Sequence, residues 1–232
     1  MMGLKGIIAS TFSVYAVSSF VRSMVEAGSK VEDAQTGLTT LLGNAKDASR
    51  VIQNTMEDAT KTPFAFEGLL NANKALISAG VNADNARQDV LNLGNAIAAT
   101  GGGDAELQRM VVNLQQISNT GKATALDIKQ FAFAGVNIYK VLEAAGIKAN
   151  AKGEESAITY EQITMALQRA HEAGGIYYHG LENMAGNTSV KISNLGDAVF
   201  QLKVKMFNDL KPAIEGIVTG LFRLIEHLKN GW

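Results

Sequence analysis

Glycine ends one helix-length amphipathic segment after another through the middle of the chain, and this punctuation limits what the chain can fold into. Apolar residues recur at helical spacing between the glycines, and polar residues suited to N-terminal capping stand at the segment starts. The glycines that we place just past helix ends in left-handed geometry are Gly80, Gly135 and Gly146. The predicted caps are Asn82, Asp104, Thr124, Asn137 and Thr159. This pattern predicts an all-α fold.

Composition sets the scale of that fold. The chain has 232 residues, of which 47% are hydrophobic, so it can bury a sizeable core. It has no cysteine, which excludes disulfides and cysteine-based metal sites. The formal net charge of −1 comes from interspersed acidic and basic residues, so we expect no nucleic-acid partner. We predict an N-terminal amphipathic helix over residues 1–43, a compact helical domain over 44–180, and a long C-terminal helix over 181–232.

Four short motifs follow one another in a distinctive order. Residues 61–64 hold a Thr-Pro-Phe turn, 79–81 a helix closing on Ala-Gly, 121–122 a Gly-Lys step, and 134–136 an Ala-Gly-Val segment. This order resembles the N-terminal domain of tape measure proteins from long-tailed bacteriophages and prophages, and residues 174–199 are similar to its closing segment. The resemblance covers roughly residues 31–199. No single motif is specific to that family; the order and spacing of all of them carry the resemblance.

The resemblance implies a structural function. Tape measure proteins are long helical virion components whose length sets tail length and which occupy the lumen of the tail tube. By resemblance, the chain is expected in the phage tail after assembly in the bacterial host cytoplasm, with tail tube, initiator or chaperone proteins as partners. A wholly helical chain of this length would reach only ~350 Å. We therefore expect the sequence to be an N-terminal fragment of a longer protein.

The N-terminal segment has two interpretations. Its apolar run after one lysine is typical of a secretory signal, but serines and a threonine interrupt the run. The alternative is an amphipathic helix, whose shared face would hold Val14, Val17, Phe20, Val21 and Met24. We favour the amphipathic helix, so membrane contact is not expected.

The C-terminal segment carries a coiled-coil-like seam. Its apolar or small residues recur in steps of four and three at Thr188, Ile192, Leu195, Val199, Leu202 and Met206. Pro212 predicts a kink or break near residues 209–211. Beyond it the pattern resumes at Ile217, Leu221, Leu224 and Leu228, which are our candidate interaction residues. We expect self-association through the terminal helices, and the resemblance to tape measure proteins implies three or six copies, because phage tails have rotational symmetry. The alternative is that the seam up to Met206 is only the buried stripe of a helix lying on the domain.

Motifs for catalysis or ligand binding are incomplete. Gly121 and Lys122 look like the end of a phosphate-binding loop, but Gln116 occupies the position of its first glycine. The three histidines, His171, His179 and His227, are not at metal-ligand spacing. We therefore predict no catalytic, cofactor-binding or metal-ligating residue and no enzyme activity. Two alternatives stay open: a helical adaptor that binds a partner peptide in an apolar groove, and part of a cell-wall-degrading tail enzyme. The polar residues 148–157 are predicted to form an exposed loop.

Overall fold

A computed structural model describes the backbone of residues 4–148 and 158–230, and the side-chain environments of residues 15–148 and 158–229. The structure is 81% helical, and the described residues form ten helices and no strand. The all-α prediction is confirmed. The loop predicted at residues 148–157 lies outside the described residues, except for Lys148.

The chain divides into two compact units, which we call the helical domain and the terminal-helix unit. The helical domain is Gln35–Asp197, and the terminal-helix unit consists of Met1–Ala34 and Ala198–Trp232. The expected boundaries, at residues 43/44 and 180/181, differ from this division. The chain passes between the units inside its two long helices, α1 (Leu4–Leu42) and α10 (Thr188–Asn230), and not at their ends.

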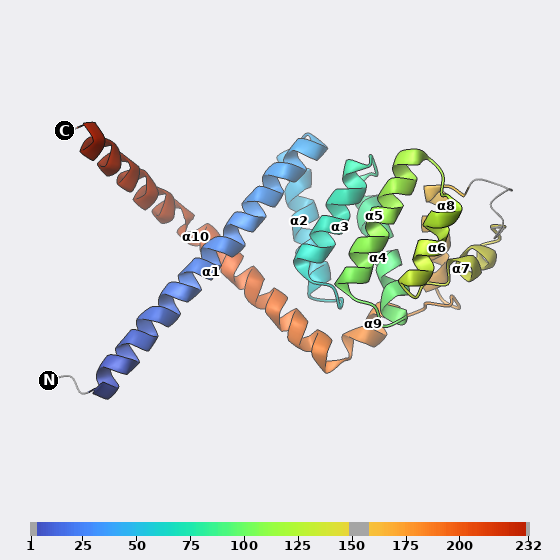
Figure 1. The fold of residues 1–232 in the computed structure, drawn as a ribbon, viewed down its shortest axis with the longest axis horizontal. Coiled ribbons are helices and arrows are strands. Elements are labelled where there is room, and N and C mark those ends of the chain that lie inside the picture. The colour runs from blue at the N-terminus through green and yellow to red at the C-terminus, as the bar shows by residue number, and fades with distance from the viewer. Residues whose placement is uncertain (1–3, 149–157, 231–232) are drawn as a thin grey trace. The chain divides into compact units, whose positions relative to one another are not determined.

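Eight shorter helices come between the two long ones in the sequence, and they are labelled in Figure 1. They are α2 (Ala45–Ala59), α3 (Phe66–Ser78), α4 (Ala83–Ala99), α5 (Asp104–Thr120), α6 (Ala125–Phe133), α7 (Ile138–Ala144), α8 (Tyr160–His171) and α9 (Gly180–Ala185). Helix α3 packs on α2, α4 and α5, and α4 also packs on α8 and α9. The predicted C-terminal helix therefore begins at Thr188, because the short α9 takes up the residues from Gly180.

Most of the predicted caps are present. Thr124 and Thr159 each accept a hydrogen bond from the backbone N–H three residues later and form reciprocal capping boxes. Gly80, Gly135 and Gly146 have φ of +87°, +77° and +76°, so their predicted left-handed geometry is confirmed.

Asp104 is an exception among the predicted caps. Gly103 is the N-terminal cap of α5, and Asp104 is already the first helical residue. Its carboxylate instead accepts a hydrogen bond from the Ala65 N–H at 3.2 Å, just before α3. The predicted cap was wrong. The local pattern assigned the Asp104 side chain to its own helix, whereas this side chain binds a residue far away in the sequence.

The core of the helical domain is formed by apolar faces of its central helices. Fully buried side chains include Leu69, Leu76, Leu93, Ile97, Leu107, Met110, Leu114 and Ile117. The Thr-Pro-Phe turn adds Phe64, which is 1% exposed. A Cβ at Gly94 would lie 2.8 Å from the Phe64 ring, so the missing side chain on α4 makes room for the phenylalanine. The turn is thus anchored in the core.

Polar groups fix the backbone on both sides of this turn. The Asn194 Nδ2 donates to the Thr60 carbonyl at 3.0 Å, and the Phe66 N–H donates to Asp197 Oδ1 at 3.1 Å. Burial raises the pKa of both Asp104 and Asp197. Two carboxylates at the N-terminus of α3 are favoured by its unpaired N–H groups and by the helix dipole. The first turns of α10 therefore belong to the helical domain and hold its turn in place.

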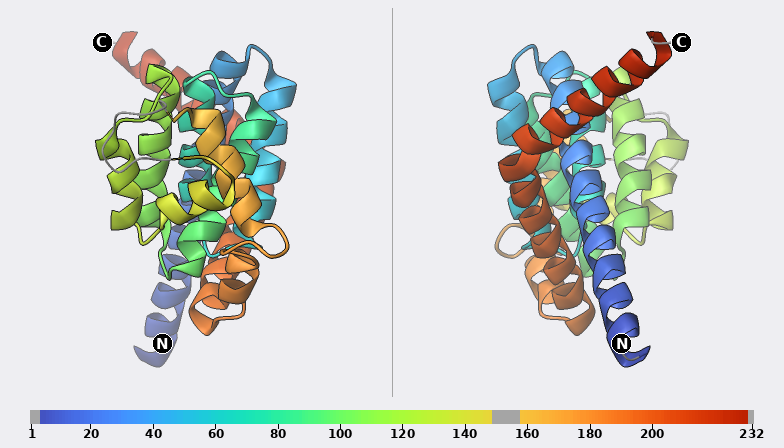
Figure 2. Two further views of the ribbon diagram at one scale, coloured as in Figure 1. Left: turned by 90° about the vertical axis from the view of Figure 1, so that its right-hand side faces the viewer. Right: turned by 90° about the vertical axis from the view of Figure 1, so that its left-hand side faces the viewer.

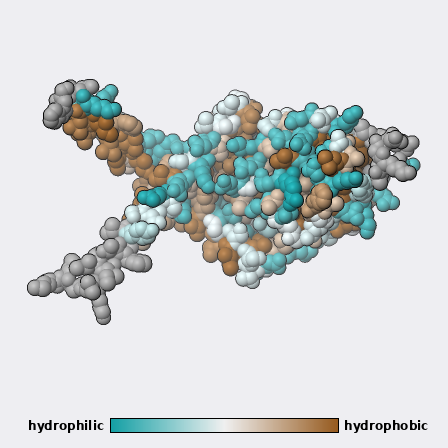
Figure 3. Space-filling view, viewed as in Figure 1, coloured by the Kyte–Doolittle hydropathy of each residue, from teal (hydrophilic) through white to brown (hydrophobic). Residues whose placement is uncertain are grey.

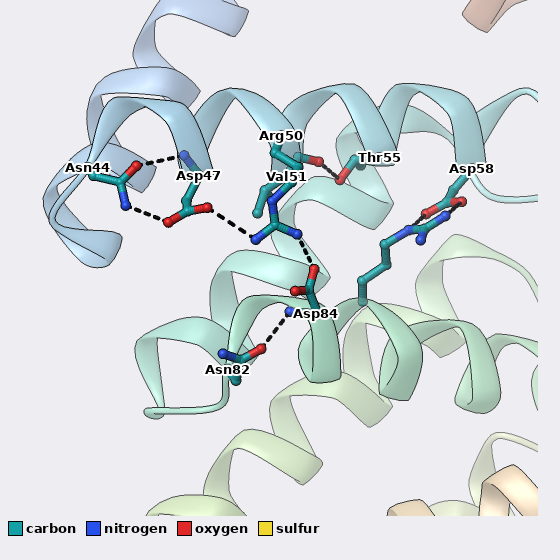
Figure 4. Close-up of polar contacts among 9 residues, drawn as sticks. Asn44, Asp47, Arg50, Val51, Thr55, Asp58, Asn82 and Asp84 are labelled. Carbon is teal, nitrogen blue, oxygen red and sulfur yellow. Dashed lines mark hydrogen bonds and ion pairs between the residues drawn. The ribbon is translucent and has the colours of Figure 1, made fainter.

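Ion pairs connect α2 with α4 in the same domain (Figure 4). Arg87 binds Asp58 through two hydrogen bonds of 2.6 Å, and the Asp58 side chain is only 9% exposed. Arg50 contacts both Asp47 and Asp84 on the exposed side of the pair. The Asp58–Arg87 pair is the better shielded of the two, so removal of one partner should cost more stability there than at Arg50.

In the terminal-helix unit, α1 and α10 meet at Gly28. The Phe207 ring lies where a Cβ of Gly28 would be, 2.0 Å from its ideal position. Lys211 forms an ion pair with Glu32 next to this contact. Gly28 does not interrupt α1, which continues as one helix to Leu42. Its small size allows the two helices to approach each other.

Pro212 does not break α10. The helix is continuous from Thr188 to Asn230 with Pro212 inside it, so of the predicted kink or break, the break is wrong. Figure 2, in its right-hand view, shows the helix as one ribbon that changes direction before its C-terminal end. Proline removes one hydrogen bond and crowds the preceding turn, which bends a helix without necessarily ending it.

Candidate interaction surface

Helix α10 carries two apolar stripes on nearly opposite sides. The buried stripe includes Val190, Val204 and Phe207, which are 4–6% exposed. The predicted seam lies two residues further on, which is about 200° around a helix. Its members Ile192 and Leu195 are 66% and 64% exposed. The alternative that the seam is the buried stripe of α10 is therefore wrong, and the sequence pattern had identified the exposed face.

The C-terminal turns of α10 bury nothing. Every described side chain from Glu215 to Lys229 is exposed. The four candidate interaction residues Ile217, Leu221, Leu224 and Leu228 are 54–65% exposed and form one row. Their neighbours Val218, Phe222 and Ile225, which were not predicted, are also exposed. They could have been found from the sequence, because each of them directly follows one of the predicted residues and widens the same apolar face.

Together these seven residues form a surface that we call the α10 apolar face. It spans roughly 160° of the helix circumference, with Thr219 and Glu226 on the opposite side. Figure 3 shows hydrophobic residues along this end of α10. A face wider than a narrow coiled-coil seam suits packing against two or more helices.

Helix α1 has a smaller exposed apolar surface. Tyr15, Val17, Phe20 and Val21 are 40–73% exposed, whereas Met24 is 2% exposed. Among the described residues of α1, burial therefore starts near Met24, and Val17, Phe20 and Val21 of the predicted face are exposed to solvent. The side chain of Val14, which we assigned to the same face, lies outside the described residues.

A second candidate site is a groove in the helical domain between α4 and α8. Its volume is about 430 Å³, and its lining includes the turn after α3. Asp89 lies in it and accepts a hydrogen bond from the Tyr160 hydroxyl at 2.6 Å. Burial raises the pKa of Asp89 to about 6, and the hydroxyl bonds from Tyr160 and Thr164 only partly offset this effect. No local motif marked this site, since Asp89 and Tyr160 are 71 residues apart.

The Gly-Lys step at residues 121–122 follows a helix in the structure. Gly121 has φ of +77° and ends α5, so a helix precedes it where a phosphate-binding loop would follow a strand. Within the described ranges, no group of three or more metal-ligating side chains could hold a metal ion. The same part of the chain contains no helix long and apolar enough to cross a membrane.

Comparison with protein-family models, with curated proteins and with solved structures found no match to this chain.

Proposed function

We propose that the chain is the N-terminal part of a phage tail tape measure protein. The support is the ordered set of motifs, together with the positions that these motifs occupy. The Thr-Pro-Phe turn inserts Phe64 into the core, Gly80 and Gly135 follow α3 and α6, and Gly121 ends α5. Each motif therefore has a structural reason for its residues. In this proposal the helical domain has a structural function in tail assembly and no catalytic activity.

The observation that carries the proposal is the form of α10. This helix has 43 residues, which at ~1.5 Å per residue gives roughly 65 Å. It leaves the helical domain after Asp197, and its last turns expose the α10 apolar face. A helix of this kind suits the start of a helical rod that is packed against other helices. The rod would occupy the tail tube lumen and set tail length in the virion.

We further propose that the α10 apolar face packs against copies of the same chain. Three or six copies fit the symmetry of a tail, and a 160° face suits more than one neighbour. Tail tube, initiator and chaperone proteins are the other partners in this proposal. Exposed apolar surfaces of this extent mark interaction sites or aggregation hazards in soluble proteins.

The test changes the length of the rod. In the phage or prophage that encodes the protein, about 70 residues of amphipathic helical sequence are inserted after Asn230, and tails are measured by electron microscopy. We expect tails longer by roughly 100 Å, because each helical residue adds ~1.5 Å. A deletion of equal size further along the same gene should shorten tails by the same amount. Tails of unchanged length in both variants would contradict the proposal.

The adaptor alternative has one observation in its favour, the α4–α8 groove. That alternative predicted an apolar groove, whereas most groups lining this one are polar. It also predicts a monomer at high concentration, which light scattering can test. Release of soluble fragments from purified peptidoglycan by the protein would instead support the cell-wall-degrading alternative.

A further inference from the structure

The α4–α8 groove has the size and lining of a binding site for one long side chain. A volume of about 430 Å³ is within the range of small-ligand sites in proteins. Val81 and Met165 provide apolar surface in its wall, and Asp89 provides a partly buried carboxylate. An apolar wall with a carboxylate inside is complementary to an aliphatic chain that ends in a positive charge.

No described residue provides a counter-ion for the Asp89 carboxylate. The Tyr160 hydroxyl, which is neutral, donates a hydrogen bond to Asp89 at 2.6 Å. The Thr164 hydroxyl also favours the charged carboxylate, whereas the like charge of Glu161 disfavours it. The residues that line the groove, all of them described, include no lysine, arginine or histidine. A partly buried carboxylate without a cation is unfavourable, and a cationic ligand would relieve this cost.

The helix ends beside the groove do not provide an anion site. Helices α4 and α8 both start there, but Asn82 caps the first and Thr159 caps the second through their side-chain oxygens. Their N-terminal N–H groups are therefore already partly used. The net charge of the lining residues is negative, from Asp89 and Glu161. An anionic ligand would meet repulsion.

The rim indicates that the cation is attached to a peptide. Asn85 and Gln168 are exposed amide side chains at the groove. An amide side chain can both donate to and accept from a peptide group, whereas an alkylammonium ion without a peptide group only donates. We propose that the α4–α8 groove binds a lysine or arginine side chain from a segment of a partner protein, with the Asp89 carboxylate as its counter-ion. This inference does not depend on the proposed function, since any helical interaction domain could use such a groove.

The test uses three small probes followed by NMR on the complete chain. N-acetyl-lysine-N-methylamide carries both cation and peptide groups, N-acetyl-norleucine-N-methylamide lacks the charge, and n-butylammonium lacks the peptide groups. We expect saturable shifts of the Gly80 and Thr164 amides with the lysine probe, and affinity at least about tenfold weaker for norleucine, as for loss of a charged hydrogen bond. The lysine probe should also bind more tightly than n-butylammonium.

Two variants separate a binding site from non-specific attraction. Asp89→Asn keeps an acceptor for Tyr160 but removes the charge, and should weaken lysine-probe binding by at least about tenfold. The control Glu143→Gln removes an exposed carboxylate on α7 and should leave binding unchanged. The carboxyl carbon of Asp89 gives an independent signal, because the lysine probe should lower its pKa from about 6 and norleucine should not.

Each alternative outcome overturns a defined part of the inference. Equal binding of the lysine and norleucine probes would overturn the role of charge. Equal binding of the lysine probe and n-butylammonium would overturn the protein segment as the ligand and leave a simple amine site. Unchanged binding by Asp89→Asn would show that Asp89 is not the counter-ion.

Discussion

The helical domain and the terminal-helix unit contain similar amphipathic helices, whose apolar faces are buried in the first and exposed in the second. In α5, Leu107, Met110 and Leu114 are all 0% exposed. In the last turns of α10, Leu221 and Leu224 are each 54% exposed. Both helices carry apolar residues in steps of three and four. Apolar periodicity therefore identifies which face of a helix is apolar. Whether that face is buried depends on which other segments of the chain pack against it.

The two units also use polar residues differently. In the helical domain, buried polar groups connect segments far apart in sequence, as Asp197 does with the Phe66 N–H. In the terminal-helix unit, the polar contacts around Lys211 are exposed ion pairs with Glu32 and Glu215, which raise the pKa of Lys211. Exposed pairs contribute little to stability. We therefore expect substitutions in the helical domain to change folding and substitutions in the exposed turns of α10 to change association.

The largest effect is expected at Phe64, whose ring is buried against Gly94. Phe64→Ala should lower the free energy of unfolding by about 3–5 kcal/mol, because it removes a fully buried aromatic side chain and leaves a cavity. Phe133→Ala is the matched control, since Phe133 is 71% exposed and its loss should cost less than about 0.5 kcal/mol. Urea unfolding followed by circular dichroism measures both. Similar losses for the two variants would show that the Thr-Pro-Phe turn is not anchored in the core.

Asp89 should make the stability of the helical domain depend on pH. Its folded pKa of about 6 is above the unfolded value near 3.8, so the protonated form favours the folded state. The contribution is fully present below pH ~4 and is lost as the pH rises through 6, with a total of roughly 3 kcal/mol for two pKa units. Relative to the parent, Asp89→Asn should therefore gain stability between pH 4 and 7. Parallel pH profiles of the two proteins in urea unfolding would contradict this expectation.

The ion pair between α2 and α4 should contribute less. Arg87→Ala leaves the buried Asp58 carboxylate without its two hydrogen bonds, and we expect a loss of about 2 kcal/mol. Arg109→Ala is the control, because Arg109 is 47% exposed and pairs with Glu106 on the same helix. Its expected cost is below about 0.5 kcal/mol. Equal decreases in the unfolding midpoint for the two variants would contradict this expectation. They would mean that the Asp58 carboxylate becomes hydrated when Arg87 is removed.

A smaller effect is expected at the left-handed glycines. Gly80→Ala and Gly146→Ala should each cost about 1 kcal/mol, since the site is open but φ is positive. Gly135→Ala should cost more, because Thr100 lies 3.1 Å from the added Cβ. Gly37→Ala is the control in the same unit, where φ is helical and the nearest atom is 3.8 Å away, so it should stabilise by up to about 1 kcal/mol. A loss for Gly37→Ala as large as for Gly80→Ala would show that backbone conformation does not explain these positions.

Features that depend on a few neighbouring residues could be predicted from the sequence. The capping box at Thr159 needs only Gln162, and the positive φ of Gly80 follows from where the apolar pattern of α3 stops. The all-α fold and the exposed row from Ile217 to Leu228 rest on the same kind of local period.

Features that depend on distant residues were missed. The close approach of α1 and α10 at Gly28 was not predicted, because it depends on the ring of Phe207. Asp104 is of a residue type that often caps helices, but its carboxylate accepts a hydrogen bond from the Ala65 N–H. The α4–α8 groove requires Asp89 and Tyr160 to meet, which depends on how α4 packs on α8. No local pattern contains that information, because packing of two helices is decided by their whole apolar faces.

The smallest effect on stability, and the largest on association, is expected at the α10 apolar face. Leu221 and Leu224 lie on this face beyond Pro212, where no described side chain is buried. Leu221→Asp with Leu224→Asp should leave the unfolding of the helical domain unchanged, because neither side chain contributes to its core. The same variant should reduce self-association, since a helix interface would have to bury two charges. The matched control, Thr219→Asp with His227→Asp, adds the same charge outside the face and should associate like the parent.

Light scattering over a concentration series decides among the outcomes. A parent protein that stays monomeric at high concentration would contradict self-association of this face in the isolated chain. A double variant that unfolds the helical domain would show that the face belongs to the core of the protein and would remove the contrast between the two units.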